Sequence, residues 1–260
     1  MALARLPVQL KAACDALLDL CFPVRCQGCL ELKHELICQD CRRGIGYIQR
    51  PLCDRCGRPF EALAHTADVC GDCRRQAPAF DLARAVGTHT GPLRRLIIAY
   101  KFEGRTRLAE PLAQMLEEYL TSPGGPGARL LAETEVIVPV PLHPNRRRWR
   151  GYDQAELLAT NLAPRLGRPA LLSALARVKE TQPQISLTPA QRRSNVRGAF
   201  RVRDPGAIAG RQVMLLDDVF TTGATMQECA KALKRAQAKS VAALTLSRSS
   251  PEWDAARDLF

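Results

Sequence analysis

The hydrophobic and polar positions of this chain follow two periods, one typical of strands and one typical of helices. Continuous apolar runs predict strands at residues 83–90, 136–140, 213–216 and 241–246, and a further one near 170–175. Helical spacing predicts helices that begin at Gly91, at Thr106 or Arg107, at Asp153 and near Thr225. Thr225 and Glu228 are expected to form a capping box. Because apolar strands that alternate with helices are typical of a parallel sheet covered by helices, residues 79–260 are predicted to form an α/β domain.

The most specific segment lies at the end of the apolar run Val213–Leu216. Two adjacent carboxylates, Asp217 and Asp218, stand where open α/β sheets place ligand-binding groups. A small, hydroxyl-rich loop, Thr221–Thr225, follows and leads into a helix, so its free N–H groups can bind a phosphate. Gly223 allows the backbone of this loop to approach a ligand closely. The segment therefore predicts a ribose-phosphate site, and it lacks the GxxxxGK[ST] run of a nucleoside-triphosphate loop.

The cysteines form a second strong pattern, because eight of the eleven occur in CxxC pairs. The pairs are Cys26/Cys29, Cys38/Cys41, Cys53/Cys56 and Cys70/Cys73. Two CxxC turns can complete a tetrahedral Cys₄ site for Zn²⁺, so residues 23–78 are predicted to form a double zinc ribbon with two structural sites, at least one of them filled. Sequential pairing of the four CxxC turns is favoured, and interleaved pairing is the alternative. Clustering without a secretory signal favours metal over redox or disulfide chemistry.

Charge and the amino-terminal segment add information about location and partners. The formal net charge of +12 favours anionic partners such as phosphorylated small molecules or nucleic acid. Residues 1–22 have the spacing of a short amphipathic helix and lack the features of a signal peptide. No apolar run approaches the length of a membrane-spanning helix. We therefore expect a cytoplasmic protein without membrane insertion.

Two polar segments are candidates for further phosphate contacts. Residues 141–152 follow the predicted strand 136–140 and are rich in arginine, whose guanidinium group suits phosphate oxygens. Trp149 interrupts this basic loop, which would equally suit a single-stranded nucleic acid with one stacked base. Residues 177–200 form a long polar segment with a helical turn expected at Thr188, and loops of that length in compact domains are functional or disordered.

The run from Val213 to Thr225 closely resembles the signature of type I phosphoribosyltransferases, which bind 5-phosphoribosyl-1-pyrophosphate (PRPP) with Mg²⁺. The resemblance implies that Asp217 and Asp218 are catalytic residues that bind the ribose hydroxyls. It implies further contacts to PRPP, mainly to the 5′-phosphate, from Val219, Thr221, Thr222, Gly223, Ala224 and Thr225. The pyrophosphate would lie near Pro141, Leu142 and Arg146. Arg177 and Lys179, on the loop that closes over PRPP, would neutralise the departing pyrophosphate as further catalytic residues.

Over nearly its whole length the chain resembles the ComF family, also called GntX-like. Besides the CxxC array and the PRPP signature, the resemblance rests on the order of the motifs Tyr100–Gly104, Val138–Leu142, Arg150–Gln154, Thr181–Gln184 and Asn195–Phe200. It implies a cytoplasmic, zinc-bearing, PRPP-binding protein that serves DNA uptake in natural transformation beside a competence helicase and a recombination mediator. Asp153 stands where asparagine is common, and the tail 249–260 runs past the usual end.

Two functions remain open from these residues, with the first slightly favoured. The first is a phosphoribosyltransferase that joins PRPP to an unknown acceptor and releases pyrophosphate. The second is a non-enzymatic, PRPP-responsive accessory protein that binds single-stranded DNA, and a zinc-dependent nucleic-acid binder with a vestigial PRPP site is a variant of it. The acceptor would be recognised by Phe80–Leu120 or by the tail, and no combination of aromatic and polar residues in Phe80–Leu120 identifies it.

Overall fold

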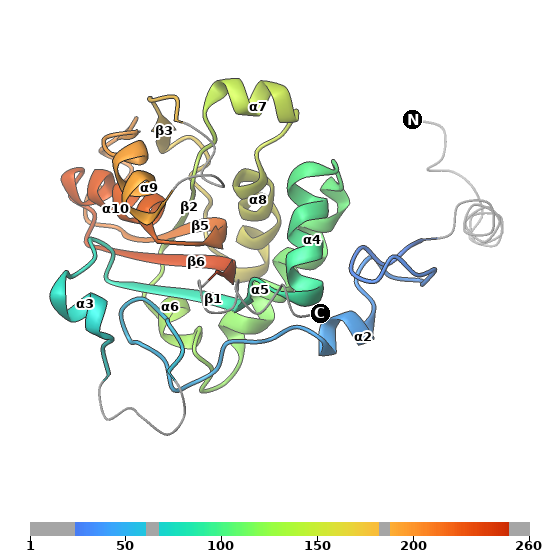
Figure 1. Cartoon of the computed structure of the whole chain (residues 1–260). Helices are drawn as coiled ribbons and strands as arrows, with labels where there is room; N and C mark the ends of the chain where they lie inside the picture. Colours follow the sequence, from blue (N-terminus) through green and yellow to red (C-terminus); the bar gives the residue numbers. More distant parts are fainter. Residues whose placement is uncertain (1–23, 61–67, 182–187, 250–260) are drawn as a thin grey trace.

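The computed structural model describes residues 24–60, 68–181 and 188–249 (Figure 1). Its centre is a four-stranded sheet in the order β1-β6-β5-β2, and every neighbouring pair is parallel. The strands are β1 (Leu82–Thr88), β2 (Val136–Pro139), β5 (Gln212–Phe220) and β6 (Ser240–Arg248). The predicted parallel sheet is confirmed. The helix predicted at residues 1–22 lies outside the described residues.

Both faces of the sheet are covered, because successive side chains of a strand point to opposite faces. On one face, Met214 and Leu216 of β5 join a hydrophobic core with α4 (Gly91–Phe102), α5 (Ala109–Thr121) and α8 (Gln154–Leu166). On the other face, Val213 and Leu215 pack in a second core with α10 (Ala224–Arg235). Burial of both faces explains why the strands are continuous apolar runs in the sequence.

Smaller elements connect these layers. They are η2 (Thr106–Leu108), α6 (Ala128–Ala132), α7 (Pro144–Arg150), α9 (Pro189–Val196), and the antiparallel pair β3 (Leu175–Arg177) and β4 (Phe200–Val202). The helical turn expected at Thr188 is confirmed, since the Thr188 side chain caps α9. The predicted helix start at Asp153 is also confirmed, because Asp153 caps α8.

Four local predictions were wrong or incomplete. The basic loop contains α7, which Pro144 opens and Gly151 ends with a φ of +82°. The strand expected near residues 170–175 is only a single bridge from Ala170 to Ile137, and β3 begins at Leu175. β5 runs on through the acidic pair to Phe220, because its pairing with β6 continues to that residue.

The fourth correction concerns the start of α10. The expected capping box of Thr225 and Glu228 does not form, because α10 begins at Ala224 with Gly223 as its N-cap. The Glu228 carboxylate instead accepts a 2.9 Å hydrogen bond from the Gly198 N–H and pairs with Lys231. Glu228 therefore ties α10 to the segment that precedes β4.

The two cysteine-rich ribbons pack against the larger domain at different places. The first ribbon carries α2 (Gln39–Arg43) and shares its core with α4 and α5, while the second carries α3 (Gly71–Arg75) and shares its core with β5 and α10. Between them, Ile48 N–H donates to the Val86 carbonyl oxygen and fastens the chain to β1. In Figure 1, α3 of the second ribbon and α2 of the first ribbon lie on opposite sides of the sheet.

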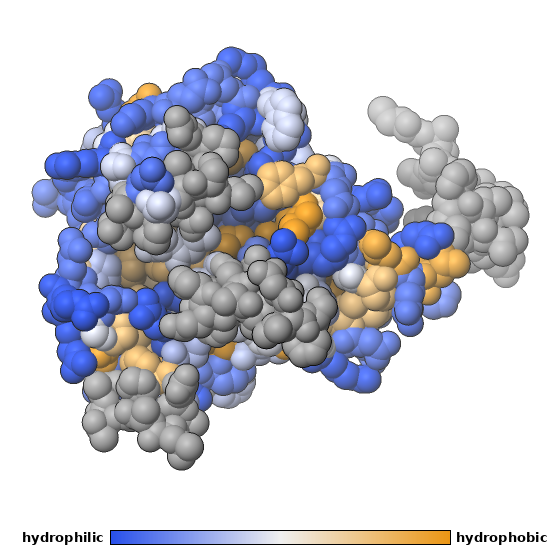
Figure 2. All heavy atoms as spheres, viewed as in Figure 1, coloured by the Kyte–Doolittle hydropathy of each residue, from blue (hydrophilic) through white to orange (hydrophobic). Residues whose placement is uncertain are grey.

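The surface is mostly hydrophilic on the side drawn in Figure 2, with apolar residues gathered over α4 and the first ribbon. The exposed apolar residues of that ribbon include Leu30 and Leu32. Within the described residues, no helix is both long and apolar enough to cross a membrane.

Candidate functional site

The acidic pair lies near the carboxyl end of β5, as the sequence predicts. Asp218 is 5% exposed and points toward the α4 side, whereas Asp217 is half-buried. The Asp217 Oδ1 atom accepts a 2.8 Å hydrogen bond from the Asp218 N–H. Burial, followed by the neighbouring Asp218 charge, raises the pKa of Asp217 to about 8. Asp217 is therefore largely protonated at neutral pH.

Lys101 is a site residue that the sequence analysis did not single out. Its Nζ atom donates a 2.7 Å hydrogen bond to Asp218 Oδ1, from the last turn of α4. The neighbouring Tyr100 is fully buried, and its hydroxyl donates to the Gln154 carbonyl oxygen at 2.8 Å. Tyr152 in turn donates to the Tyr100 carbonyl oxygen. These bonds fix the end of α4 against the start of α8, so Lys101 reaches Asp218 from a rigid frame.

The loop after β5 turns into α10 at a glycine. Gly223 has a φ of +75°, and a Cβ atom added there would lie 2.6 Å from Cζ of Phe220. Only glycine meets both conditions without strain. The Ala224 N–H contacts Thr222 Oγ1 at 3.4 Å, and the first turn of α10 leaves further N–H groups without intrahelical partners. An anion is the ligand that suits this end of a helix.

Two predicted pyrophosphate residues meet although they are far apart in the sequence. Arg146 of α7 donates to the Thr181 carbonyl oxygen at 2.9 Å, and Arg177 of β3 donates to the Thr181 hydroxyl. Burial, followed by the nearby charge of Arg146, lowers the pKa of Arg177. Burial, followed by the nearby charge of Arg150, lowers the pKa of Arg146. Among the described residues, neither guanidinium forms an ion pair, and the buried Arg177 Nε atom lacks a hydrogen-bond partner. A buried guanidinium and a half-buried one that form no ion pair in the described part of the chain favour an anionic ligand.

The other predicted residues of this region differ in their placement. Lys179 is exposed. Pro141 and Leu142 are half-buried in the turn after β2, where the Leu142 N–H donates to Asp153 Oδ2 at 2.8 Å. Asp153 Oδ1 also accepts from the Glu156 N–H. Asp153 therefore joins the turn to the first turn of α8 and positions both.

An aromatic ring with a cation lies at the end of α4. Phe102 follows Lys101 at the end of α4 and is 51% exposed, and the Arg150 guanidinium lies 5.0 Å from its ring centroid. Arg150 is held by a 2.7 Å hydrogen bond from Nη1 to Gln154 Oε1. The pair is not evident in the sequence, because its members come from α4 and α7. Their positions in the two motifs Tyr100–Gly104 and Arg150–Gln154 were the available signal.

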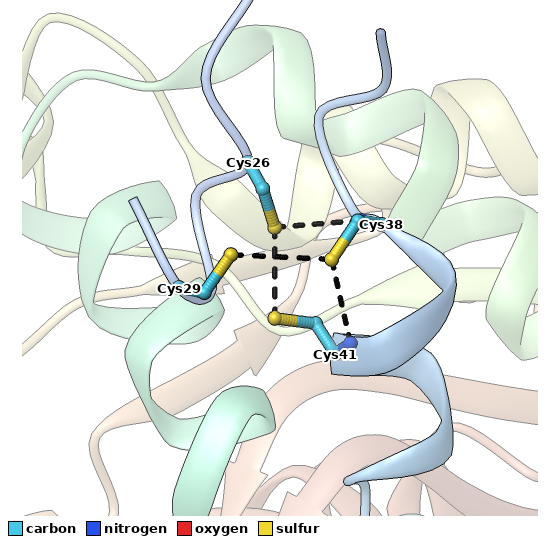
Figure 3. A group of neighbouring side chains, drawn as sticks. All are labelled: Cys26, Cys29, Cys38 and Cys41. Carbon is cyan, nitrogen blue, oxygen red and sulfur yellow. Dashed lines mark hydrogen bonds between the residues drawn. The ribbon is translucent and has the colours of Figure 1, made fainter. Parts of the chain in front are cut away.

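The eight CxxC cysteines form two separate groups, which confirms the sequential pairing. One group is Cys26, Cys29, Cys38 and Cys41, and the other is Cys53, Cys56, Cys70 and Cys73. In each group all sulfur atoms lie within 4.8 Å of one another. Figure 3 shows the four sulfurs of the first group turned toward a common centre.

The distances and hydrogen bonds fit zinc. A zinc ion bonded to four sulfurs at about 2.3 Å holds them roughly 3.8 Å apart, and the distances between sulfurs are 3.6 Å for Cys26–Cys41 and 3.7 Å for Cys56–Cys70. Although burial opposes ionisation, N–H groups led by that of Cys38 lower the pKa of the Cys26 thiol to about 6. A set of four cysteine sulfurs, some of which accept backbone N–H bonds, is suited to structural Zn²⁺.

Family comparisons agree with this arrangement. A double zinc ribbon domain model matches residues 17–76, and a phosphoribosyl transferase domain model matches residues 153–257. Competence protein F of Haemophilus influenzae is 33% identical over 227 residues, which cover 87% of this chain and 96% of that protein. The chain belongs to the ComF family. Its fold is that of a phosphoribosyltransferase preceded by a double zinc ribbon, as the sequence predicts.

Other members of the ComF family match over similar lengths. The DNA utilization protein YhgH of Salmonella typhimurium is 36% identical over 227 residues, 86% of this chain and 95% of that protein. Competence protein ComFC of Bacillus subtilis is 28% identical over 223 residues, 83% of this chain and 85% of that protein. Among solved structures, the glutamine PRPP amidotransferase of B. subtilis is 23% identical with a TM-score of 0.33, over 54% of this chain and 26% of that chain.

Proposed function

We propose that this ComF-family protein binds PRPP with Mg²⁺ and transfers its phosphoribosyl group to an acceptor, within the handling of incoming DNA. The observation that carries the proposal is the convergence of Arg146 and Arg177 on Thr181, next to the acidic pair. PRPP carries a phosphate at C5 of its ribose and a pyrophosphate at C1. The phosphate loop Thr221–Thr225, the acidic pair and the two guanidiniums provide a partner for each part of that ligand in the same order.

Each group has a definite role in this proposal. Asp217 and Asp218 accept hydrogen bonds from the ribose hydroxyls, and the N–H groups of Gly223 to Thr225 donate to the 5′-phosphate. Arg146 and Arg177 neutralise the pyrophosphate as the bond from ribose C1 to its oxygen breaks. Mg²⁺ bound to PRPP would supply further positive charge at the same oxygens. The electron pair of an acceptor nitrogen then forms the new bond to C1, and that nitrogen loses its proton.

The acceptor side of the proposal rests on Lys101 and Phe102. Lys101 must exchange Asp218 for a ligand group or share it when ribose binds, because it occupies one carboxylate oxygen. The exposed ring of Phe102 lies one residue away and could hold the flat face of a planar acceptor. The proposal includes the partners that the family resemblance implies, which are a competence helicase and a recombination mediator in the cytoplasm.

The test compares two ligands that differ only in the pyrophosphate. Calorimetric titration of the full chain with PRPP and with ribose 5-phosphate, both with Mg²⁺, should show binding of both. Arg177→Gln should weaken the binding of PRPP at least tenfold and change the binding of ribose 5-phosphate less than twofold. Asp217→Asn should weaken the binding of both ligands. Arg168→Gln, at an exposed arginine outside the site, is the matched control. Equal loss of both ligands in Arg177→Gln would contradict the assignment of Arg177.

Turnover separates the two functional classes. Pyrophosphate release that depends on an added base or amine, and that Asp218→Asn abolishes, would establish the transferase. PRPP binding without release by any acceptor would favour the accessory protein instead. Trp149, which is 78% exposed on the arginine-rich α7, supports that second function, because such a helix suits a single strand with a stacked base. The binding of a single strand to α7 should weaken steeply with salt and survive the substitutions of Asp217 and Asp218.

A further inference from the structure

Arg248 links the second zinc ribbon to the phosphate loop. It is the last residue of β6 and only 6% exposed. Its Nη1 atom donates a 2.7 Å hydrogen bond to the carbonyl oxygen of Cys56, and its Nη2 atom lies 3.9 Å from the Cys56 sulfur. The same guanidinium lies 4.5 Å from the ring centroid of Phe220. A single side chain thus contacts a zinc ligand and the residue that precedes the phosphate loop.

Phe220 transmits this contact to the loop itself. The ring is held edge-on by Phe80 at 6.0 Å between centroids, and Gly223 packs so closely on it that a Cβ atom would clash. The Ser249 N–H donates to the Phe220 carbonyl oxygen at 2.9 Å. The loop therefore packs on the Phe220 ring, and the position of the ring sets the direction of the N–H groups that follow. A shift of Arg248 would move this ring and the loop with it.

The second ribbon also forms one wall of the cleft into which the loop opens. This cleft has a volume of about 860 Å³ and lies between the ribbon and α10. Cys73 and Arg75 line it on the ribbon side, and Thr222 and Gly223 line it on the loop side. The chain that leaves the ribbon is fastened to α10, because the Ala79 N–H donates to Gln227 Oε1 at 2.8 Å.

The first ribbon provides an internal control. Within the described residues, its links to the larger domain run to α4 and α5, for example the 3.4 Å ion pair between Arg42 and Glu118. None of its residues lines the cleft at the phosphate loop. The two zinc sites share a donor set and differ in what they touch, so an effect of the loop on one site alone can be measured against the other.

We propose that zinc in the second site and a phosphate ligand in the loop stabilise each other through Arg248 and Phe220. Zinc holds four thiolates and their turns in a tetrahedron, which fixes the Cys56 carbonyl oxygen and leaves negative charge for the guanidinium. Arg248 is then a positioning residue for the loop. The inference rests on the proposed phosphate binding, and linkage makes the coupling reciprocal: whatever zinc adds to phosphate affinity, phosphate adds to zinc affinity.

The reciprocal form gives a test that needs no enzymatic activity. Zinc release from the full chain to a chromogenic chelator is followed with and without saturating ribose 5-phosphate. The expected result is two phases of one zinc each, of which the ligand slows one at least fivefold and leaves the other within twofold. In Cys29→Ser, which removes a ligand of the first site, the remaining zinc should be the protected one.

Substitution of Arg248 shows whether the coupling runs through this residue. Arg248→Met should retain two zincs per chain and lose the protection, and Arg248→Lys should restore part of it. Arg42→Met, which cuts a link of the first ribbon, should leave the protection intact. Binding of ribose 5-phosphate without selective protection of one zinc overturns the coupling alone. Absence of binding to the zinc-loaded wild type overturns the proposed function together with the coupling.

Discussion

Lys101 Nζ lies 2.7 Å from Asp218 Oδ1, although 117 residues separate them in the sequence. The side chains are 22% and 7% exposed, so the pair is largely removed from water. Removal of one partner from such a pair leaves a buried charge without compensation. Lys101 therefore ties the end of α4 to Asp218 of β5.

Lys101→Met should destabilise the protein by about 2 kcal/mol, because the Asp218 carboxylate loses its cation in a buried place. Urea unfolding at neutral pH measures the change. Lys234→Met is the matched control, since Lys234 pairs with Asp81 at 2.8 Å on a more exposed surface. That substitution should cost less than about 1 kcal/mol. Equal losses in the two variants would mean that burial of the Lys101 pair contributes nothing.

Gly223→Ala should abolish binding of ribose 5-phosphate as well as destabilise the fold. Its Cβ atom would meet the Phe220 ring at 2.6 Å, in addition to the cost of a φ of +75°. Gly167→Ala separates the two effects, because Gly167 has a φ of +60° and open space around it. The control should lose about 1 kcal/mol of stability from backbone strain alone and keep the ligand. Ligand binding by Gly223→Ala would contradict the assigned phosphate loop.

Asp217→Asn should change the pH dependence of stability. The pKa of Asp217 is about 8 in the folded protein and about 4 in an unfolded chain. Between these values the unfolded chain loses its proton first, so this residue makes the fold less stable as pH rises through that range. Urea unfolding at pH 5, 7 and 9 should show a smaller decline with pH in Asp217→Asn than in the wild type. The exposed Asp68→Asn should follow the wild-type profile, and parallel curves for all three proteins would refute the raised pKa.

Asp153→Ala should weaken the turn after β2 and α8 together. The carboxylate accepts from the Leu142 N–H and from the Glu156 N–H, and burial raises the pKa of Asp153. Loss of the cap alone costs about 1 kcal/mol, and the unpaired Leu142 N–H adds to that cost. Asp153→Asn should recover about half of the loss, because its single amide oxygen can accept from only one of the two N–H groups. Thermal unfolding of both variants measures this, and full recovery by asparagine would show that one of the two hydrogen bonds contributes nothing.

The parallel sheet, the paired CxxC turns and the acidic pair were predictable because each leaves a local pattern. Apolar runs mark strands buried on both faces, and cysteines with two residues between them mark metal turns. α7 was not predictable by the same means, because it buries none of its residues and therefore has no apolar period. The Thr225–Glu228 pattern misled for a related reason. Glu228 reaches Gly198, a partner that local sequence does not reveal.

The site was predictable only as far as its parts lie close together in the chain. Asp217 and the loop after it could be read directly, and Arg146 and Arg177 could be proposed separately. That the two arginines meet on Thr181, and that Lys101 reaches Asp218, depends on how α4, α7 and β3 gather at one end of the sheet. Such contacts follow from packing and leave no periodic trace in the sequence.

The pairing of β1 with β6 has a consequence for how this molecule forms during synthesis. Leu82 finds its hydrogen-bonding neighbour at Ala242, so the edge strand stays unpaired until nearly all of the described chain has been made. Both cysteine ribbons precede that strand and can take up metal locally, whereas closing so long a loop is slow. We therefore expect metal loading to come early and sheet closure late. In a cell short of zinc, the ribbons would still lack metal when β6 is made.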